Sequence, residues 1–158
     1  MKLSRSTIVL LAVALVVATT LAPGRAAQAP QAQATVRFTA MDVLLDVGDT
    51  PVAAYQIHVT TSAGDVTLVG IEGGEHAAFR QPPYYDPKAM GQNRIVLGAF
   101  NTGSDLPRGR TRVARLMVRV TGDTPPAYAA TVQVAASPDG KPIPNAAVSL
   151  TESEGADQ

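Results

Sequence analysis

The distribution of apolar and polar residues along the chain predicts a series of short β-strands. In AAYQIHVTT (53–61) every second residue after Ala54 is apolar, which is the pattern of a strand with one buried and one wet side. Similar segments are VTLVGI (66–71), TRVARLMVRV (111–120), YAATVQVAA (128–136) and AAVSL (146–150). Turns rich in glycine and proline separate them, and no long window has helical periodicity. The sequence therefore predicts an all-β fold, an antiparallel β-sandwich of seven or eight strands.

Two of the expected strands depart from simple alternation. In VRFTAMDVLLDV (36–47) the apolar residues begin at Val36 and Phe38 and then resume in the opposite phase from Val43, with the change near Ala40. Such a change predicts a bulge or bend, as where a strand passes from one sheet to the other. RIVLGAF (94–100) is apolar at nearly every position, which predicts a strand covered on most of both faces.

The N-terminus has the layout of a secretory signal peptide. Lys2 and Arg5 precede an apolar run (8–18) that is shorter than the roughly 18 to 20 residues of a membrane span. We expect cleavage after residue 26, with a second possible site before Thr35, and therefore a secreted or periplasmic protein without stable membrane insertion. Residues 27–34 are predicted to be a flexible leader, 35–151 the β-sandwich domain and 152–158 a disordered acidic tail.

Composition excludes several classes of function. The chain has no cysteine, so it has no disulfide, thiolate metal site or thiol nucleophile. After residue 26 it carries ten basic and thirteen acidic side chains, and this slightly acidic balance gives no reason to expect nucleic acid as a partner. A domain of about 120 residues is long enough for one ordinary hydrophobic core.

The segment QPPYYDPKAMGQN (81–93) is the first candidate binding surface. Tyr84 and Tyr85 can stack on sugar rings or form a hot spot for a protein partner. Alternatively, one ring packs on the sandwich while the prolines stiffen a long connection. Adjacent residues of an extended segment point in opposite directions, so we expect at most one ring to face solvent, and we favour the stiffened connection.

An arginine-rich segment is the second candidate. Its members are Arg108, Arg110, Arg112, Arg115 and Arg119. Arg115, Met117 and Arg119 are expected to share a strand face with Val113. This mixed patch fits an acidic protein or an acidic polysaccharide. The alternative, which we favour, is a solvated sheet face whose charges discourage edge pairing.

The remaining ionisable residues predict neither a metal site nor catalysis. They are Asp42, Asp46 and Asp49, the two histidines His58 and His76, and the pair Glu72 and Glu75. Three carboxylates without a ligand-rich loop are a poor calcium site, and neither histidine has a second histidine at ligand spacing. We expect both histidines to be surface residues, and no catalytic residue, metal or cofactor is predicted.

The order of three segments resembles the cohesin domain. They are GDTPVAAYQIHVTTSAGDVTLVGIEGG (48–74), NRIVLGAFNTG (93–103) and GRTRVARLMVRVTGD (109–123). The resemblance implies a jelly-roll β-sandwich related in fold to carbohydrate-binding modules, with an aromatic residue at the place of Tyr55. It also implies noncovalent protein recognition, in that family of a calcium-loaded dockerin. The Tyr-Asp-Pro step common in cohesins is replaced here by residues 60–63, and no interface position matches.

Three hypotheses of function follow, and each predicts a different surface. The leading one is an exported, noncatalytic, cohesin-like protein-binding module, which requires an exposed sheet face of mixed apolar and charged residues. The alternative is a carbohydrate-binding module that uses Tyr84 or Tyr85, which requires a solvent-facing ring beside polar groups. An enzyme, the third, requires a concave pocket with convergent ionisable groups.

Overall fold

The computed structural model describes residues 34–153. The expected signal peptide, almost all of the leader and residues 154–158 lie outside this range. The described part holds seven strands and two one-turn 3₁₀-helices: β1 (Val36–Asp46), β2 (Ala54–Ala63), β3 (Asp65–Gly73), η1 (Ala77–Phe79), η2 (Pro87–Ala89), β4 (Arg94–Phe100), β5 (Arg110–Thr121), β6 (Ala127–Ala136) and β7 (Ala147–Ser153). β7 continues two residues past the domain end that we expected at 151.

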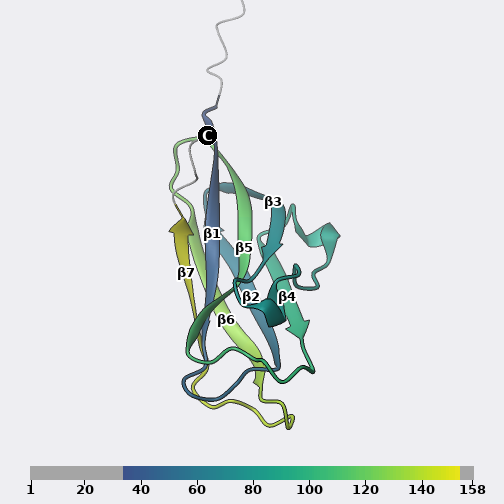
Figure 1. Cartoon of the computed structure of the whole chain (residues 1–158). Helices are drawn as coiled ribbons and strands as arrows, with labels where there is room; N and C mark the ends of the chain where they lie inside the picture. Colours follow the sequence, from purple (N-terminus) through teal and green to yellow (C-terminus); the bar gives the residue numbers. More distant parts are fainter. Residues whose placement is uncertain (1–33, 154–158) are drawn as a thin grey trace, which may run out of the picture. The chain divides into compact units, whose positions relative to one another are not determined.

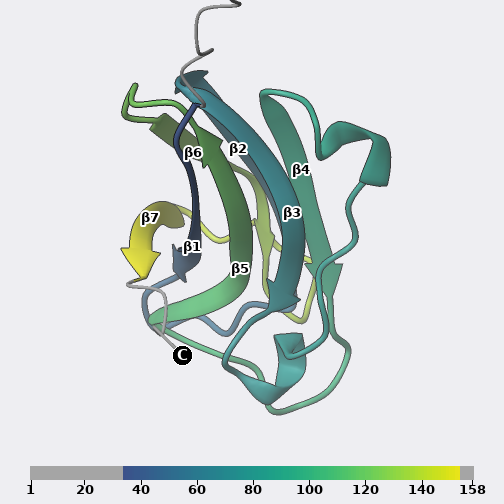
Figure 2. The same ribbon diagram turned by 90° about the horizontal axis from the view of Figure 1, so that it is seen from above.

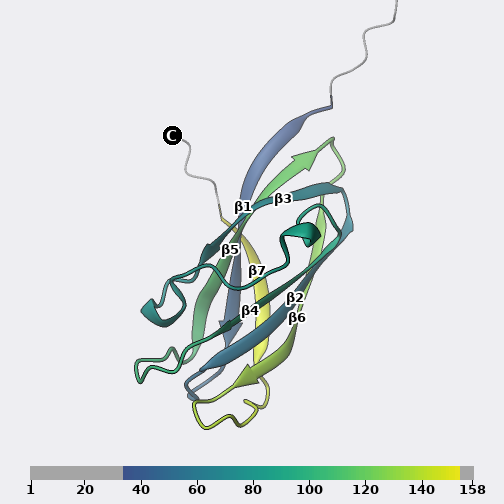
Figure 3. The same cartoon turned by 90° about the vertical axis from the view of Figure 1, so that its right-hand side faces the viewer.

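The strands form two antiparallel sheets (Figure 1). The four-stranded sheet has the order β3-β5-β1-β7, and the three-stranded sheet, which can be followed in Figure 3, has the order β4-β2-β6. All paired strands are antiparallel. The predicted all-β, antiparallel architecture is therefore confirmed, with the two sheets packed face to face as in a β-sandwich.

One hydrophobic core lies between the sheets. Val43 and Leu45 of β1 are fully buried, and so are Ile57 of β2 and Leu97 of β4. Removing a side chain of this size from water stabilises the folded chain by about 1.5–3 kcal/mol. Successive side chains of a strand point to opposite faces of the sheet, so strands with alternating apolar and polar residues place their apolar side chains in the core.

β1 has no bulge near Ala40 and does not pass to the other sheet, so that prediction was wrong. It pairs with β5 without interruption from Val36 to Val43. Its apolar residues Val36 and Phe38 instead lie on the outer face of the sheet, where Phe38 is 69% exposed. The irregularity occurs in β5, where Val113 is an extra residue between the partners of Val43 and Leu44.

The bulge at Val113 corrects a second prediction. Val113 was expected on the same face as Arg115, which stands two positions away. Because the bulge adds one residue to β5, Val113 turns inward together with its neighbour Ala114, and both are fully buried. The outer face therefore presents Arg115 and Met117 without this valine.

β4 is an edge strand of the three-stranded sheet. Contrary to the expectation that most of both its faces would be covered, its outer face is exposed at Arg94 and Phe100. Ile95 and Leu97 point into the core and are buried. Phe100, at the end of the strand, pairs with Ala54 on the outer face and is 79% exposed.

The connection between β3 and β4 covers one edge of each sheet. Tyr84 exchanges two backbone hydrogen bonds with Gly98 of β4, with N···O distances of 2.7 and 3.0 Å. Farther along, the amide of Leu68 in β3 donates to the carbonyl of Met90 at 3.1 Å. Figure 2 shows this segment running along the side of β4. The proline-rich loop is thus fixed at two points, and it satisfies backbone groups that would otherwise be unpaired.

Candidate binding faces

The outer side of the four-stranded sheet is the first candidate site. We define the four-stranded face by Phe38, Asp42, Arg115, Met117 and Arg119. Phe38 lies directly opposite Arg119, and Asp42 lies directly opposite Arg115. Side chains of directly opposed residues in antiparallel strands lie on the same face and touch. The structure therefore brings together the three residues of this region that the sequence singled out, and adds Phe38 and Asp42.

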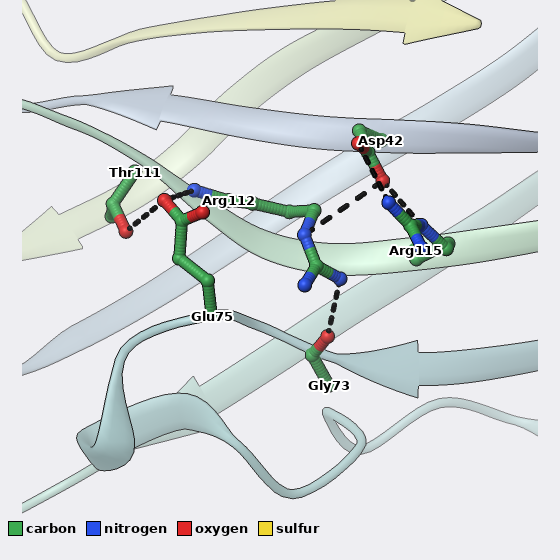
Figure 4. Close-up of polar contacts among 6 residues, drawn as sticks. All are labelled: Asp42, Gly73, Glu75, Thr111, Arg112 and Arg115. Atoms are coloured by element: carbon green, nitrogen blue, oxygen red, sulfur yellow. Dashed lines mark hydrogen bonds and ion pairs between the residues drawn. The ribbon is translucent and has the colours of Figure 1, made fainter. Parts of the chain in front are cut away.

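Asp42 fixes the arginines at one end of this face (Figure 4). The Nε and Nη2 atoms of Arg115 donate to the two carboxylate oxygens at 2.7 and 3.1 Å. Nε of Arg112 lies 3.8 Å from the same carboxylate, and its Nη1 donates to the carbonyl of Gly73 at 3.1 Å. The bidentate hydrogen bonds from Arg115 are the main reason that the pKa of Asp42 is lowered and that of Arg115 raised. Both guanidinium groups are held in place before any partner arrives.

Glu75 holds the turn after β3 against β5. Its carboxylate accepts a hydrogen bond from the backbone N–H of Arg112 at 2.9 Å and another from the Thr111 hydroxyl at 3.1 Å (Figure 4). The backbone hydrogen bond from Arg112 is the largest cause of the lowered pKa of Glu75. This carboxylate therefore has a structural role in joining two elements.

The other end of the four-stranded face mixes apolar side chains with Arg119 and the polar residues Thr67 and Asp65. Phe38 is exposed, and Met117 is half-buried beside it in the next row. Val69 is the extra residue of a bulge in β3 opposite Met117, and it is 46% exposed. Arg119 donates to the Thr67 hydroxyl at 3.2 Å, and no carboxylate in residues 34–153 lies within ion-pair distance of it. Arg119 thus offers a guanidinium to an incoming acidic group.

The outer side of the three-stranded sheet is the second candidate site. We define the three-stranded face by Tyr84, Gly98, Phe100, Gln56 and His58. Tyr84 is 82% exposed, whereas Tyr85 is half-buried and packs against the core. One ring faces solvent and the other holds the loop, so the two interpretations of this segment apply to different tyrosines.

The two histidines lie at the surface and are partly exposed. Nδ1 of His76 accepts the backbone N–H of Ala78 at 3.2 Å and so begins η1. Nε2 of His58 lies 3.3 Å from Nε2 of Gln56. Among residues 34–153 there is no group of three or more histidine, aspartate or glutamate side chains placed to hold a metal ion.

Two hollows at the surface of the described residues have volumes of a few hundred Å³. One of about 380 Å³ lies beside β6 and is lined by Val134, Pro142 and Ile143 among others. Another, of about 340 Å³, contains Arg37, Glu152 and Tyr128, and neither histidine reaches it. The exposed side chains of the two outer faces are therefore the more prominent features.

Comparison with protein-family models, curated proteins and solved structures finds no match to this chain. In the part that the structure describes, no helix is long and apolar enough to cross a membrane. The binding surfaces must therefore be argued from their own geometry and chemistry.

The structure adds two aromatic residues that the sequence analysis did not select, Phe38 and Phe100. Phe38 stands at an even position of β1, as do Asp42 and Asp46, and these two polar residues mark the outward side of the strand. Because Phe38 has the same parity as these polar residues, the sequence could have indicated that Phe38 faces outward. Phe100 shares the outward parity of Arg94 in β4, but the nearly continuous apolar run of this strand gave little reason to distinguish its two faces.

Proposed function

We propose that this chain is an exported, noncatalytic, cohesin-like interaction module that binds a partner protein through the four-stranded face. The observation that carries the proposal is the position of Phe38 beside Arg119, which has no acidic partner among residues 34–153, on a face where Arg115 and Arg112 are already fixed. Aromatic and arginine side chains supply much of the binding energy in protein interfaces.

The face suits a protein because it combines an apolar surface with one available charge. Phe38, Met117 and Val69 give contact area that is favourable to remove from water. Arg115, fixed by Asp42, loses little side-chain entropy when a partner binds. Charge complementarity then calls for a partner that places an aspartate or glutamate against Arg119 and apolar side chains against Phe38.

The order of three sequence segments and the N-terminal sequence support the rest of the proposal. The segments 48–74, 93–103 and 109–123 resemble a cohesin, a jelly-roll domain whose function is noncovalent protein recognition. The basic and apolar N-terminal segment favours export to the periplasm or the outside of the cell. We do not propose a calcium-loaded dockerin as the partner, because no interface position of the cohesin family matches in this chain.

The test is affinity capture followed by a direct binding measurement. The chain from residue 27 onward is immobilised and exposed to envelope and secreted fractions of the producing cell. The variants Phe38→Ala and Arg119→Glu are treated in the same way. The matched control is Phe100→Ala, which removes an equally exposed ring from the opposite face. Any protein retained by the wild type and the control is purified, and its affinity is measured by calorimetry.

We expect Phe38→Ala to weaken the measured affinity about tenfold, and Arg119→Glu to weaken it at least as much, because it places a like charge against the partner's acid. Equal retention by all four proteins would show that the four-stranded face is not the interface. A partner lost only from Phe100→Ala would overturn the proposal in favour of the other face.

A further inference from the structure

The three-stranded face differs in chemistry from the four-stranded face. Its most exposed large apolar side chains are two aromatic rings, Tyr84 and Phe100. Tyr84 pairs directly with Gly98, and Phe100 follows two residues later on the same strand and the same face. A residue and the diagonal neighbour of its partner lie about 7–8 Å apart across antiparallel strands. The two rings are therefore neighbours at the edge of a rigid sheet.

Between the rings the surface is open. A Cβ atom added to Gly98 would meet only the carbonyl oxygen of Tyr55, at 3.8 Å. The space above Gly98 is thus free of side-chain atoms. The missing side chain leaves a backbone floor between Tyr84 and Phe100 on which a flat ligand can rest.

Polar groups without formal charge line the next row. Gln56 lies directly opposite Gly98 on β2, and His58 follows it on the same face, with 3.3 Å between their Nε2 atoms. An amide and an imidazole supply hydrogen-bond donors and acceptors beside the rings. A sugar hydroxyl can donate a hydrogen bond to such an acceptor and accept one from such a donor.

The charge of this face excludes several classes of ligand. The outward positions of its strands are 54, 56, 58 and 60 of β2, 94, 96, 98 and 100 of β4, and 129, 131, 134 and 136 of β6. Only Arg94 among them is charged, and it stands at the opposite end of β4 from Phe100. On the segment that carries Tyr84, Asp86 and Lys88 are also exposed, and their charges are opposite. The surface around Tyr84 and Phe100 therefore has no cluster of one sign that would attract an acidic polymer or a highly charged peptide.

We propose that the three-stranded face is a second, separate binding site, for a neutral polysaccharide whose sugar rings stack on Tyr84 and Phe100 over Gly98. An aromatic face offers a pyranose ring a flat apolar contact, while Gln56 and His58 hydrogen bond its hydroxyls. The site is independent of the proposed protein interface, which lies on the other sheet.

Affinity electrophoresis of the exported chain tests this site. The native gels contain cellulose derivative, soluble chitin derivative, mixed-linkage β-glucan or mannan, with polygalacturonate as the acidic comparison. The variants are Tyr84→Ala, Phe100→Ala and Gly98→Val. Gly98→Val keeps both rings and suits a strand, but fills the floor between them. Phe38→Ala is the control, since it removes a ring from the other sheet. Circular dichroism establishes that each variant is folded.

We expect at least one neutral polysaccharide to retard the wild type and Phe38→Ala equally. Each ring deletion should weaken the apparent affinity about tenfold, and Gly98→Val should abolish it. Absence of retardation by every neutral polysaccharide would overturn the proposal, as would retardation that survives Gly98→Val. Retardation by polygalacturonate alone, or capture of a protein that depends on Tyr84, would also overturn it. None of these outcomes bears on Phe38 and Arg119, so the two proposals fail separately.

Discussion

The hydroxyl of Tyr55 donates a hydrogen bond of 3.1 Å to the carbonyl oxygen of Val113. Tyr55 belongs to β2 in one sheet and Val113 to β5 in the other, so the bond crosses the core. The acceptor is the extra residue of the β5 bulge. The Tyr55 ring also meets Phe79 edge to face, with centroids 5.2 Å apart. Burial raises the pKa of Tyr55 above its ordinary value, so the group is neutral and can donate.

Replacing Tyr55 by phenylalanine should therefore destabilise the domain. The variant keeps the ring contact with Phe79 but leaves the buried carbonyl of Val113 without this donor. The expected loss in the free energy of unfolding is about 1–2 kcal/mol. Urea denaturation followed by circular dichroism measures it. An unchanged midpoint would show that the hydrogen bond contributes nothing to stability.

Gly74 should tolerate no side chain. A Cβ atom there would lie 2.4 Å from the carbonyl oxygen of Arg112, which is a backbone atom that cannot move aside cheaply. Gly74→Ala should cost about 1–3 kcal/mol or more in the free energy of unfolding. Gly70→Ala is the matched control, because its new methyl group would meet Met117 at 3.5 Å, an ordinary contact. Equal melting temperatures for the two variants would contradict this packing.

Stability should fall in acid through Asp42 and Glu75. Both carboxyl groups have a lowered pKa in the folded chain, Asp42 mainly through Arg115 and Glu75 mainly through the Arg112 amide. Their contribution is complete above the pKa values of the unfolded chain and is lost as the pH falls through the lower folded values, from about pH 5 downward.

The variant Asp42→Asn isolates the first of these carboxylates. Near pH 6 it should be less stable than the wild type by about 1 kcal/mol, a modest value because water screens the partly exposed pair. The difference between the two proteins should shrink toward pH 3, where Asp42 begins to bind its proton. Thermal melts at several pH values give the comparison, and a difference that stays constant with pH would refute the assignment to Asp42.

The adjacent tyrosines of the β3–β4 connection should behave differently. Tyr85→Ala removes a half-buried ring from the core and should cost about 1–3 kcal/mol in the free energy of unfolding. Tyr84→Ala removes an exposed ring, while its backbone bonds to Gly98 remain, so the change should stay within about 0.5 kcal/mol. Chemical denaturation of both variants decides the point. A large loss at Tyr84 would mean that its ring supports the fold.

The sequence was sufficient to locate the seven strands, because alternation and glycine-proline turns are local properties. It also predicted that at most one of the rings of Tyr84 and Tyr85 faces solvent, since adjacent residues of an extended segment point in opposite directions, but it did not show which one. It placed Arg115, Met117 and Arg119 on one face for the same reason.

Features that depend on neighbouring strands could not be read in this way. The bulge at Val113 exists only in the pairing of β5 with β1, and the phase change in residues 36–47 resembled a bulge while arising from outward-facing Val36 and Phe38. The nearly continuous apolar run of β4 likewise did not reveal that its outer face, which carries Phe100, is uncovered. A pattern of apolar residues does not distinguish a covered face from an uncovered one.

Phe38 and Tyr84 lie on the outer faces of the two sheets, whose inner faces pack against each other with about 10 Å between the layers. Two large objects can therefore approach the domain from opposite directions without competing for space. A flat two-layer body of this kind can serve as a tether, holding a protein on one side against an extended polymer on the other. Linking two separate attachments through one rigid domain raises the local concentration of each object near the other, even where each contact alone is weak.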